Sequence, residues 1–469
     1  MPSDLVFKNS DLVFKDSDVF KDSDVFKDSD LAPKDINAWL RYIESLHPKS
    51  IAMGLERVKQ VIGRLKLQKN FKVISVAGTN GKGSTCAMLE QIYTHAGFAV
   101  GCYTSPHLLR YNERVRINGI EVSDEALCAA FSAVETARKS EEVVALTYFE
   151  VGTLAAMWHF AQTGIDVAIL EIGLGGRLDA VNAFEPDCAI VTSVDLDHQE
   201  FLGESREEIG VEKAGVYRQS IPAICGDNHP PLSLINHAQQ IDADFKCINR
   251  DFTYTSSAAD WCYLSMGRVI HTLPLPALEG HYQLNNAACA VAAVESLQAY
   301  LPVTTASIAN AMRQVFLAGR FQTASKTPWV ILDVAHNPHA AQALAENLAG
   351  LKLTERTHTK TLAVFAMLAD KDMKGVVNTL KNEIDTWYVA NIDHVRGALA
   401  SDLAAIIAEI MPNASIKCFD TAAKAYEQAC IDTETCIDRN ENDKIVVFGS
   451  FFTVANVMQY LNQHTNPHL

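Results

Sequence analysis

The stretch VAGTNGKGST, residues 76–85, constrains the fold more than any other part of the chain. It directly follows the apolar run Val73 to Ala77 and precedes the helix-forming sequence CAMLEQIYTHA. A glycine-rich loop between a strand and a helix offers backbone N–H groups to phosphate oxygens, and a lysine reaches the outer phosphates. The sequence therefore predicts a phosphate-binding loop made of Gly78, Thr79, Asn80, Gly81, Lys82, Gly83 and Ser84.

This loop departs from the common pattern G-x-x-x-x-G-K-[ST] at two positions. Val76 stands where that pattern has its first glycine, and Gly83 follows Lys82 where a hydroxyl residue belongs. A plain glycine turn with a solvated lysine is therefore an alternative interpretation. The strand before the loop and the helix after it favour phosphate binding.

Apolar runs typical of strands alternate with helical stretches along the chain. The runs Val73 to Ala77, Val167 to Leu170 and Cys188 to Val194 end in glycine or charge, and INAWLRYIESL, residues 36–46, has apolar residues near helical spacing. This alternation predicts a parallel-rich sheet covered by helices. A second series after Arg320, with WVILDV, TLAVFAML, WYVANI and KIVVFGS, predicts a smaller α/β domain.

The boundary between the two series lies near LAGRFQTASKTP, where Gly319, Ser325 and Pro328 interrupt the pattern. We therefore predict a nucleotide-binding α/β domain over residues 31–322 and a smaller, Rossmann-like α/β domain over residues 323–469. Residues 1–30 repeat SDLVFKN, SDLVFKD, SDVFKD and SDVFKD, and this composition is typical of a disordered tail. A partner-binding or self-pairing role is the alternative for the tail.

The composition disfavours several classes of function. The chain has 40 Lys and Arg against 56 Asp and Glu, a formal net charge of −16, whereas a nucleic-acid partner normally requires a concentrated basic face. We expect no membrane span, which takes about 18 apolar residues, and no secretory leader. The 11 cysteines are scattered without a C-x-x-C pair, which favours buried thiols in the cytoplasm.

Polar residues at the ends of predicted strands are candidates for chemistry on a phosphate. Glu171 closes DVAIL, and His198 follows the next strand, at positions where open α/β sheets collect ligands. Mg²⁺ accompanies nucleotide phosphates and prefers oxygen ligands, so Glu171 is the first candidate for a metal ligand. Taken alone, His198 fits a structural role as well.

Three further residues allow a functional and a structural interpretation. Asp333 and His336 follow a strand in DVAHNP, although Asp333 could instead cap the next helix. Arg320 lies at the domain boundary, where closure could deliver it to phosphate charge; a linker ion pair fits its position equally well. Taken alone, Lys213 in REEIGVEKAG is typical of a helix-surface lysine paired with a glutamate.

Taken together, these stretches resemble the folylpolyglutamate synthase family of the Mur-ligase superfamily, over nearly all of the chain from Leu31 onward. The glycine-lysine-glycine form of the loop is shared by that family. The resemblance rests on the order and number of the stretches GLERV, VAGTNGKGST, YTSPHLLRYNERVRING, LTYFEVGTLAA, LEIGLGGRLDAVN, DLDHQEFLG, EKAGVYR, NNAACAVAAV, AGRFQ, DVAHNPHAA, MLADKDM, VRGA and GSFFTVA.

The resemblance implies a role for each matching position. It makes Ser105, Glu171 and His198 the ligands of one or two Mg²⁺ ions, and Lys213 a carbamylated lysine. Besides the loop, ATP would contact Asn286, Arg320 and Asp333, with Asn285 one position away from the first of these. The catalytic groups would be Lys82, Lys213, Arg320 and His336.

A pterin-bearing substrate would bind three segments of the first domain according to the same resemblance. Phe149 offers an aromatic face on which a flat heterocycle can stack. The sequence departs from the bacterial relatives at Ala52, where an acid is common, and at Phe452, where a histidine is common. The substrate residues are Ser50, Ile51, Ala52 and Met53, then Thr147, Tyr148, Phe149 and Glu150, and finally Arg177, Asp179 and Ala180.

The activity implied is that of a monomeric, ATP-dependent amide ligase. It would join L-glutamate to dihydropteroate, giving dihydrofolate, and to reduced folates, giving folylpolyglutamates, through an acyl phosphate. Folylpolyglutamate synthesis alone, another Mur-type ligase and a non-catalytic nucleotide-binding module are the alternatives. A Mur peptidoglycan ligase carries a further N-terminal domain, and too few non-repetitive residues precede Gly78 to form one.

Overall fold

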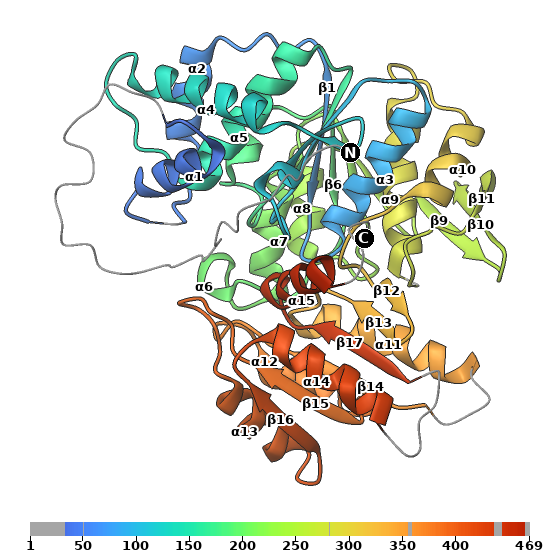
Figure 1. The fold of residues 1–469 in the computed structure, drawn as a ribbon. Helices are drawn as coiled ribbons and strands as arrows, with labels where there is room; N and C mark the ends of the chain where they lie inside the picture. The colour runs from blue at the N-terminus through green and yellow to red at the C-terminus, as the bar shows by residue number, and fades with distance from the viewer. Residues whose placement is uncertain (1–32, 50, 281, 355–358, 436–442, 465–469) are drawn as a thin grey trace, which may run out of the picture.

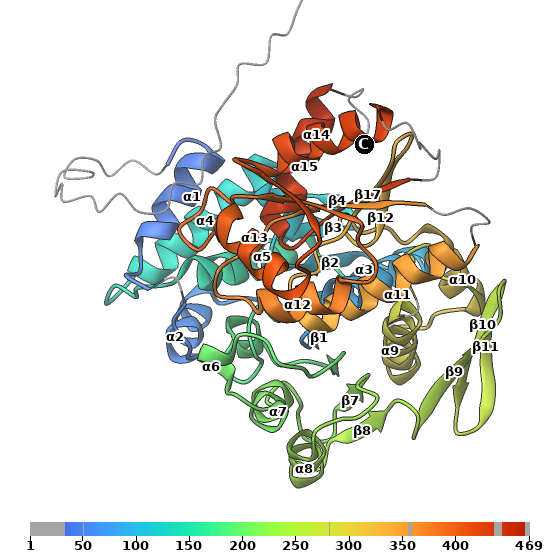
Figure 2. The ribbon, with the colours of Figure 1, turned by 90° about the horizontal axis from the view of Figure 1, so that it is seen from below.

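The computed structural model describes the chain except residues 1–32, 50, 281, 355–358, 436–442 and 465–469. The predicted disordered tail and Ser50 lie outside the described residues. Two α/β domains follow each other along the chain, each with its own large sheet, and they lie one below the other in Figure 1. Seen from below in Figure 2, the second domain lies across the first.

An eight-stranded sheet with the order β4-β3-β2-β5-β1-β6-β7-β8 forms the first domain. Its strands pair in parallel except at the edge, where β3 is antiparallel to both β2 and β4. The predicted parallel-rich sheet is thus confirmed. The strands are β1 (Lys72–Ala77), β2 (Val100–Tyr103), β3 (Val115–Ile117), β4 (Ile120–Glu121), β5 (Val167–Glu171), β6 (Cys188–Val191), β7 (Pro222–Cys225) and β8 (Asp244–Cys247).

Helices cover both faces of this sheet. One face carries α1 (Ile36–Ser45), α2 (Glu56–Leu65), α4 (Asp124–Lys139), α5 (Tyr148–Thr163), α7 (Arg206–Ala214) and α8 (Leu232–Gln240). The other face carries α3 (Lys82–His95), α9 (Tyr282–Leu297) and α10 (Thr305–Gln314), together with a small antiparallel sheet of β9 (Phe252–Ser256), β10 (Asp260–Ser265) and β11 (Arg268–Pro274). The short α6 (Gln199–Leu202) lies on the side of the second domain (Figure 1).

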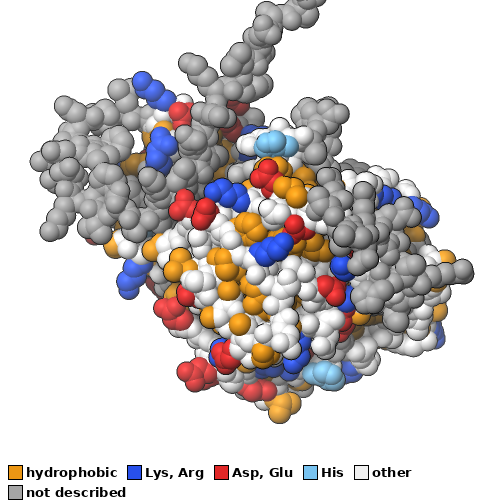
Figure 3. Space-filling view, turned by 60° about the horizontal axis from the view of Figure 1, so that its bottom comes forward, with side chains coloured by type: hydrophobic (Ala, Val, Ile, Leu, Met, Phe, Trp, Pro, Cys, Tyr) orange, Lys and Arg blue, Asp and Glu red, His pale blue; other side chains and the backbone are white. Residues whose placement is uncertain are grey.

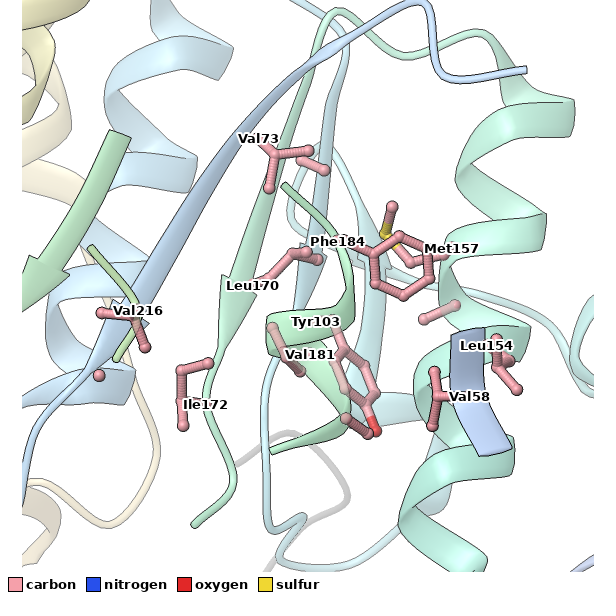
Figure 4. Packing of buried hydrophobic residues seen from close by; sticks show 14 of the residues in the cluster. Val58, Val73, Tyr103, Leu154, Met157, Leu170, Ile172, Val181, Phe184 and Val216 are labelled. Atoms are coloured by element: carbon pink, nitrogen blue, oxygen red, sulfur yellow. The ribbon is translucent and has the colours of Figure 1, made fainter. Parts of the chain in front are cut away.

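The packing on the first face holds α5 in place (Figure 4). Tyr103 of β2 lies between the sheet and α5, whose Leu154 and Met157 face the same cluster, and all three are at most 2% exposed. Burying a side chain of this size contributes about 1.5–3 kcal/mol. A capping box starts the helix, because Glu150 N donates to Thr147 Oγ1 and Thr147 N donates to Glu150 Oε2. The N-terminus of α5 is therefore fixed relative to the sheet.

A six-stranded sheet with the order β12-β13-β17-β14-β15-β16 forms the second domain, and only β12 is antiparallel to its neighbour. Its strands are β12 (Gln322–Lys326), β13 (Trp329–Leu332), β14 (Thr361–Phe365), β15 (Thr386–Ala390), β16 (Ser415–Phe419) and β17 (Lys444–Phe448). One face carries α11 (Pro338–Thr354), α12 (Met373–Leu380) and α13 (Ala400–Ile410), and the other carries α14 (Ala422–Thr435) and α15 (Phe451–His464).

One strand is shorter than the sequence predicts. β6 ends at Val191 and not at Val194, because the next residues turn toward the phosphate-binding loop. Thr192 Oγ1 donates to Asn80 O at 2.6 Å, and Asn80 N donates to Ser193 Oγ at 3.1 Å. The polar residues after β6 thus anchor the loop that follows β1.

Candidate active site

A cleft of about 1530 Å³ contains residues of both domains. It collects the loops at the carboxyl ends of β1, β5 and β6 in the first domain and of β13 and β17 in the second, as expected for parallel sheets. Among the residues predicted from the sequence, the cleft is lined by Gly78, Thr79, Asn80, Gly81, Lys82, Gly83, Ser84, Ser105, Tyr148, Glu171, His198, Lys213, Asn286, Arg320, Asp333 and His336.

The phosphate-binding loop requires glycine at two positions. Gly78 has a φ of +147°, and a Cβ there would lie 1.9 Å from Thr192 Oγ1. Gly81 has a φ of +87°, and a Cβ there would lie 2.3 Å from Asn286 Oδ1. α3 starts directly after Gly81 without a side-chain cap, so its first N–H groups remain available to an anion. This cradle fits a phosphate chain.

Lys82 is folded back over its own loop. Its Nζ donates to the carbonyl oxygens of Gly78 at 2.9 Å and Thr79 at 3.1 Å. Both partners are backbone groups of the loop itself. A small rotation of the side chain would therefore bring the ammonium to a phosphate held by the same loop.

Glu171 at the end of β5 is a buried carboxylate without a cationic contact. Its Oε2 accepts a hydrogen bond from Ser105 N at 3.0 Å, and within the described part of the chain it forms no ion pair. Burial raises the pKa of Glu171, which the ammonium of Lys82 partly opposes. The carboxylate and the hydroxyl of Ser105 provide the oxygen donors that a magnesium ion prefers.

His198 lies at the edge of the same cleft, just before α6, with a φ of +50°. Burial lowers the pKa of its imidazole to about 4, so the ring is neutral and able to bind a metal. Across the described residues no three His, Cys, Asp or Glu side chains form a metal-binding cluster. An ion held by Ser105, Glu171 and His198 would therefore complete its shell with water or phosphate oxygens.

The structure contradicts the local interpretation of Lys213 as a surface lysine. Its side chain is buried, and the described residues provide no hydrogen-bond partner for Nζ. Its neighbour Glu212 pairs instead with Arg177 at 2.7 Å. Burial, and next the positive charge of Lys82, lower the pKa of Lys213 to about 7. A good part of this amine is therefore neutral at physiological pH.

Arg320 lies just before β12, the first strand of the second domain, whose core already includes Phe321, so it belongs with Asp333 to that domain and not to the predicted first one. The Arg320 guanidinium lies 5.3 Å from the centre of the Phe451 ring. Asp333 accepts hydrogen bonds from Phe321 N and Ala335 N, each at 2.8 Å, so it fixes the linker against β13. Asp333 is thus not the cap of the following helix.

The cap of α11 is Asn337, whose Oδ1 accepts from Ala340 N at 2.8 Å. His336 in the same loop contacts Val334 O through Nδ1 at 2.8 Å, which makes Nδ1 the protonated nitrogen of the neutral ring. Burial lowers the pKa of His336. Its Nε2 lies 3.8 Å from Asp197 Oδ2, has no hydrogen-bond donor among the described residues, and can accept a proton.

Most of the predicted pterin-binding residues form a layer behind the cleft, and of the described ones only Tyr148 belongs to the cleft lining. Phe149 packs on Gly173, where a Cβ would lie 2.6 Å from Phe149 Cζ. Gly173 itself lines the cleft. The Phe149 ring therefore lies directly against the backbone of the loop that follows β5.

An ion pair missed by sequence reasoning orders this layer. Arg57 of α2 donates from Nη2 to Glu150 Oε1 at 2.8 Å and to Ala52 O at 2.7 Å. Glu150 is only 4% exposed, so Arg57 compensates a buried charge. The arginine thereby joins the segment of Ala52 and Met53 to the start of α5.

Asp179 and Arg177 lie on opposite sides of their loop. Asp179 is buried and accepts from Leu174 N and Val181 N, and burial raises its pKa to about 7. Arg177 instead borders a separate cavity of about 510 Å³ beside Arg218. Arg177 therefore does not share a pocket with Asp179 in this arrangement.

Three residues absent from the sequence prediction lie between the domains. Asp197, Asn337 and Lys371 are joined by hydrogen bonds across the cleft. Phe452, the second departure from the bacterial relatives, also lines the cleft, with its ring 4.9 Å from that of His394. Lys371 lies in MLADKDM and Asp197 in DLDHQEFLG, but no pattern in either stretch indicates a pairing over such a sequence distance.

Comparisons with known proteins agree with this architecture. The Mur ligase middle domain matches residues 76–294, and the glutamate ligase domain of Mur ligases matches residues 319–451. The chain is 43% identical to dihydrofolate synthase/folylpolyglutamate synthase of Escherichia coli over 432 residues, which is 92% of this chain and 96% of that protein.

Two solved structures share the fold. The Escherichia coli protein in complex with DHPP and ADP has a TM-score of 0.85 and 42% identity, over 93% of this chain and 99% of that one. A bifunctional folylpolyglutamate synthase/dihydrofolate synthase with Mn, AMPPNP and L-glutamate bound has a TM-score of 0.82 and 42% identity, over 92% and 99% of the two chains. The chain therefore belongs to the Mur ligase family, within its dihydrofolate synthase/folylpolyglutamate synthase branch.

Proposed function

We propose that the cleft joins L-glutamate to dihydropteroate and to reduced folates while ATP is converted to ADP and phosphate. One observation carries this proposal: Lys82, Glu171 and Lys213 of the first domain share a single cleft with Arg320 and His336 of the second. The ligands of the two similar structures, DHPP with ADP in one and Mn, AMPPNP and L-glutamate in the other, support the same reaction.

The reaction needs two steps because a carboxylate has no usable leaving group. First, the acceptor's carboxylate oxygen attacks the γ-phosphorus of ATP, the bond to the bridging oxygen breaks, and ADP leaves. The neutral amine of glutamate then attacks the acyl carbon, and the carbon–oxygen bond to phosphate breaks. The products are an amide and inorganic phosphate, and the amine's proton must be accepted by a base.

The chain's own residues stabilise the charge that develops on the transferred phosphoryl group. The N–H groups at the start of α3 and, after a rotation of its side chain, the ammonium of Lys82 would contact the phosphates, and Arg320 would approach from the second domain. A divalent cation, held by Ser105, Glu171 and His198, supplies further positive charge when bound. Asn286 and Asp333 border the same cleft, where they would contact the nucleoside part.

Lys213 fits the modification expected from the family. Its neutral amine can attack carbon dioxide, forming a nitrogen–carbon bond and releasing a proton, which turns a buried cation into a carbamate anion. The described residues leave Nζ without a hydrogen bond, and Lys213 lines the cleft. A carbamate here would place an oxygen donor on α7, facing the loop that carries Lys82.

His336 is our candidate for the base that accepts the proton of the glutamate amine. Its neutral ring has a protonated Nδ1 and an open Nε2. On the other side, the pterin ring would bind at the layer of Ala52, Met53, Phe149 and Asp179, where Phe149 packs on Gly173. Ala52 and Phe452 are the positions at which acceptor preference would differ from that of the relatives.

We further propose that the enzyme acts as a cytoplasmic monomer on small molecules. Basic and acidic side chains are interspersed on the face shown in Figure 3, which suits a small anionic substrate better than a nucleic acid. No helix in the described parts of the chain has the length and apolar character needed to span a membrane.

Release of phosphate by the purified full chain tests this function. ATP, Mg²⁺ and L-glutamate are supplied with dihydropteroate or with tetrahydrofolate in separate reactions. Glutamate-dependent release with both acceptors supports the proposal, and release with tetrahydrofolate alone reduces it to folylpolyglutamate synthesis. A chain that binds ATP but releases no phosphate with either acceptor would be a nucleotide-binding module or another ligase.

Glu171→Gln provides the matched loss-of-function variant, with Glu409→Gln on the exposed side of α13 as a control. The amide keeps an acceptor for Ser105 N–H but loses the charge that would hold the cation. We expect a loss of at least about 100-fold in phosphate release for Glu171→Gln. Equal activity of the two variants would contradict the assigned role of Glu171.

A further inference from the structure

Two loops of the second domain contact one loop of the first beside the cleft. Asp197, which follows β6, accepts a hydrogen bond from Lys371 Nζ at 2.5 Å and another from Asn337 Nδ2 at 3.1 Å. Asn337 precedes α11 and Lys371 precedes α12, so both donors belong to the second domain. The side chains of Lys371 and Asp197 are 7% and 10% exposed. This ion pair is therefore largely shielded from water and salt.

Asn337 also contacts the phosphate-binding loop. Asn80 Nδ2 donates to Asn337 Oδ1 at 3.1 Å, and Asn337 Nδ2 donates to Asn80 Oδ1 at 3.2 Å. Such a reciprocal pair fixes the distance and the relative orientation of the two amides. His339 strengthens it, with Nδ1 2.8 Å from Asn80 Nδ2. One residue of the second domain thus binds the phosphate loop and Asp197 together.

The two contact points are also connected within the first domain. Thr79 Oγ1 donates to Asp195 O at 3.0 Å and accepts from Asp195 N at 2.9 Å. Residues 192–193 bind the backbone of Asn80, as described above. The phosphate loop and the loop of Asp197 therefore form one rigid surface on which Asn337 and Lys371 dock.

The neighbours of this contact are groups of the proposed mechanism. Lys371 Nζ lies 3.4 Å from His198 Nε2, and Asp197 Oδ2 lies 3.8 Å from His336 Nε2. Asp197 has three partners on the second domain, namely Asn337, Lys371 and His336. Its Oδ1 also accepts a hydrogen bond from the backbone N of His198 at 2.8 Å. Most of the side-chain contacts of Asp197 are thus made to the other domain.

We propose that Asp197, Asn337 and Lys371 are positioning residues that hold the second domain where Arg320 and His336 face the phosphate loop. The inference rests on the proposed function, and it gives these three residues no contact with the reacting atoms. Breaking the contact leaves the phosphate cradle complete, because that cradle is built by the first domain. The break does, however, take Arg320 and His336 of the second domain away from the phosphate loop. Turnover should therefore fall much more than nucleotide affinity, to which the second domain would contribute only Arg320 and Asp333.

Two variants break the contact in different ways. Lys371→Met removes the ammonium that pairs with Asp197. Asn337→Asp keeps the acceptor for Ala340 N, and so the cap of α11, but replaces the donor to Asn80 and Asp197 by an oxygen. Lys374→Met is the matched control, because Lys374 pairs with Glu409 on the exposed side of the same domain. Lys371→Arg tests whether another cation restores the contact.

Steady-state kinetics and ADP titrations of the full-length variants test the proposal. We expect Lys371→Met and Asn337→Asp to lower kcat/KM for L-glutamate by about 30-fold or more, with a much smaller loss of ADP affinity. Lys371→Arg should recover most of the loss, and the effects of Lys371→Met and Asp197→Asn should not add. Activities equal to that of Lys374→Met, or a parallel loss of ADP affinity, would overturn it.

Small-angle scattering of the full chain with ADP and Mg²⁺ separates this inference from the proposed function. The radius of gyration should increase for Lys371→Met and Asn337→Asp and stay unchanged for Lys374→Met. This readout needs no ligase activity, so it decides the positioning role even if the unmodified chain fails to use glutamate. Unchanged scattering of both variants would contradict a role in holding the domains.

Discussion

Lys213 of α7 and Lys82 of α3 line the same cleft, where burial and the charge of Lys82 together lower the pKa of Lys213 to about 7. Two lysines facing one site would repel each other if both stayed protonated. The arrangement favours a neutral or modified Lys213. Lys82 Nζ donates to two carbonyl oxygens of its own loop.

Carbamylation of Lys213 should be observable directly. In buffer with isotopically labelled bicarbonate near neutral pH, the unmodified chain should show a carbamate carbon resonance that is absent from Lys213→Arg. The signal should weaken on acidification, because protonation removes the nucleophilic amine. A spectrum identical for both proteins would contradict the modification.

The shifted pKa of Lys213 also predicts how stability depends on pH without carbon dioxide. The unfolded lysine titrates near 10.5 and the folded one near 7, so the folded state binds fewer protons between these values. Stability should therefore rise with pH over this window, relative to Lys213→Met. Urea unfolding at several pH values measures this difference, and parallel curves for the two proteins would exclude a lowered pKa.

Replacing Lys82 should affect turnover far more than stability. Lys82→Met removes a charge that the proposed mechanism places on the transferred phosphoryl group, and we expect kcat to fall by about 100- to 1000-fold. Its two hydrogen bonds in this structure go to its own loop, so the melting temperature should stay close to that of Lys374→Met. A variant that loses stability and activity together would contradict this role.

Arg57 should control the acceptor site without affecting ATP. Arg57→Met leaves the buried carboxylate of Glu150 unpaired and should destabilise the fold by about 2–3 kcal/mol. It also releases the carbonyl of Ala52. We expect KM for dihydropteroate to rise several-fold with KM for ATP unchanged. Lys59→Met, on the exposed side of α2, is the control; a rise in KM for ATP alone would argue against this assignment.

The raised pKa of Asp179 predicts that stability depends on pH in the opposite sense to that expected from Lys213. Burial raises the pKa of Asp179 from 3.8 to about 7, so the folded state binds more protons over this range. Its contribution to stability is greatest below pH about 4 and is lost as the pH rises through 7, by up to about 4 kcal/mol. Asp179→Asn should remove this slope in urea titrations, and an unchanged slope would place the effect elsewhere.

The sequence predicted the elements whose signals are local. Gly78 and Lys82 follow a strand and start a helix, as the glycine pattern indicated, and Glu171 ends its strand at the same sheet edge. The parallel-rich sheet followed from the alternation of apolar runs and helices. The antiparallel edge of β3 and β4 and the small sheet of β9 to β11 were not predicted, because short amphipathic strands have weak patterns.

Properties that depend on distant contacts could not be read from the sequence. Lys213 has the local sequence of a surface lysine, and its burial follows only from the packing of α7 on the sheet. Asp197 and Lys371 are 174 positions apart, and only the docking of two domains brings them together. The stretches that contain Asp197 and Lys371 were recognised from the family resemblance, but their ion pair was not predicted.

The linker between the domains has little freedom. Leu317 packs into the core of the first domain, whereas Gly319 is already tied to the second, because Val334 N donates to Gly319 O at 2.9 Å. Any pivoting is therefore concentrated at Ala318 and at the glycine beside it, whose φ is +68°. Arg320 lies just beyond this pivot and travels with the second domain. With the two domains apart, the nucleotide would stay bound to the first domain but Arg320 would not reach it. Hydrolysis of ATP without ligation would therefore be suppressed until the domains close.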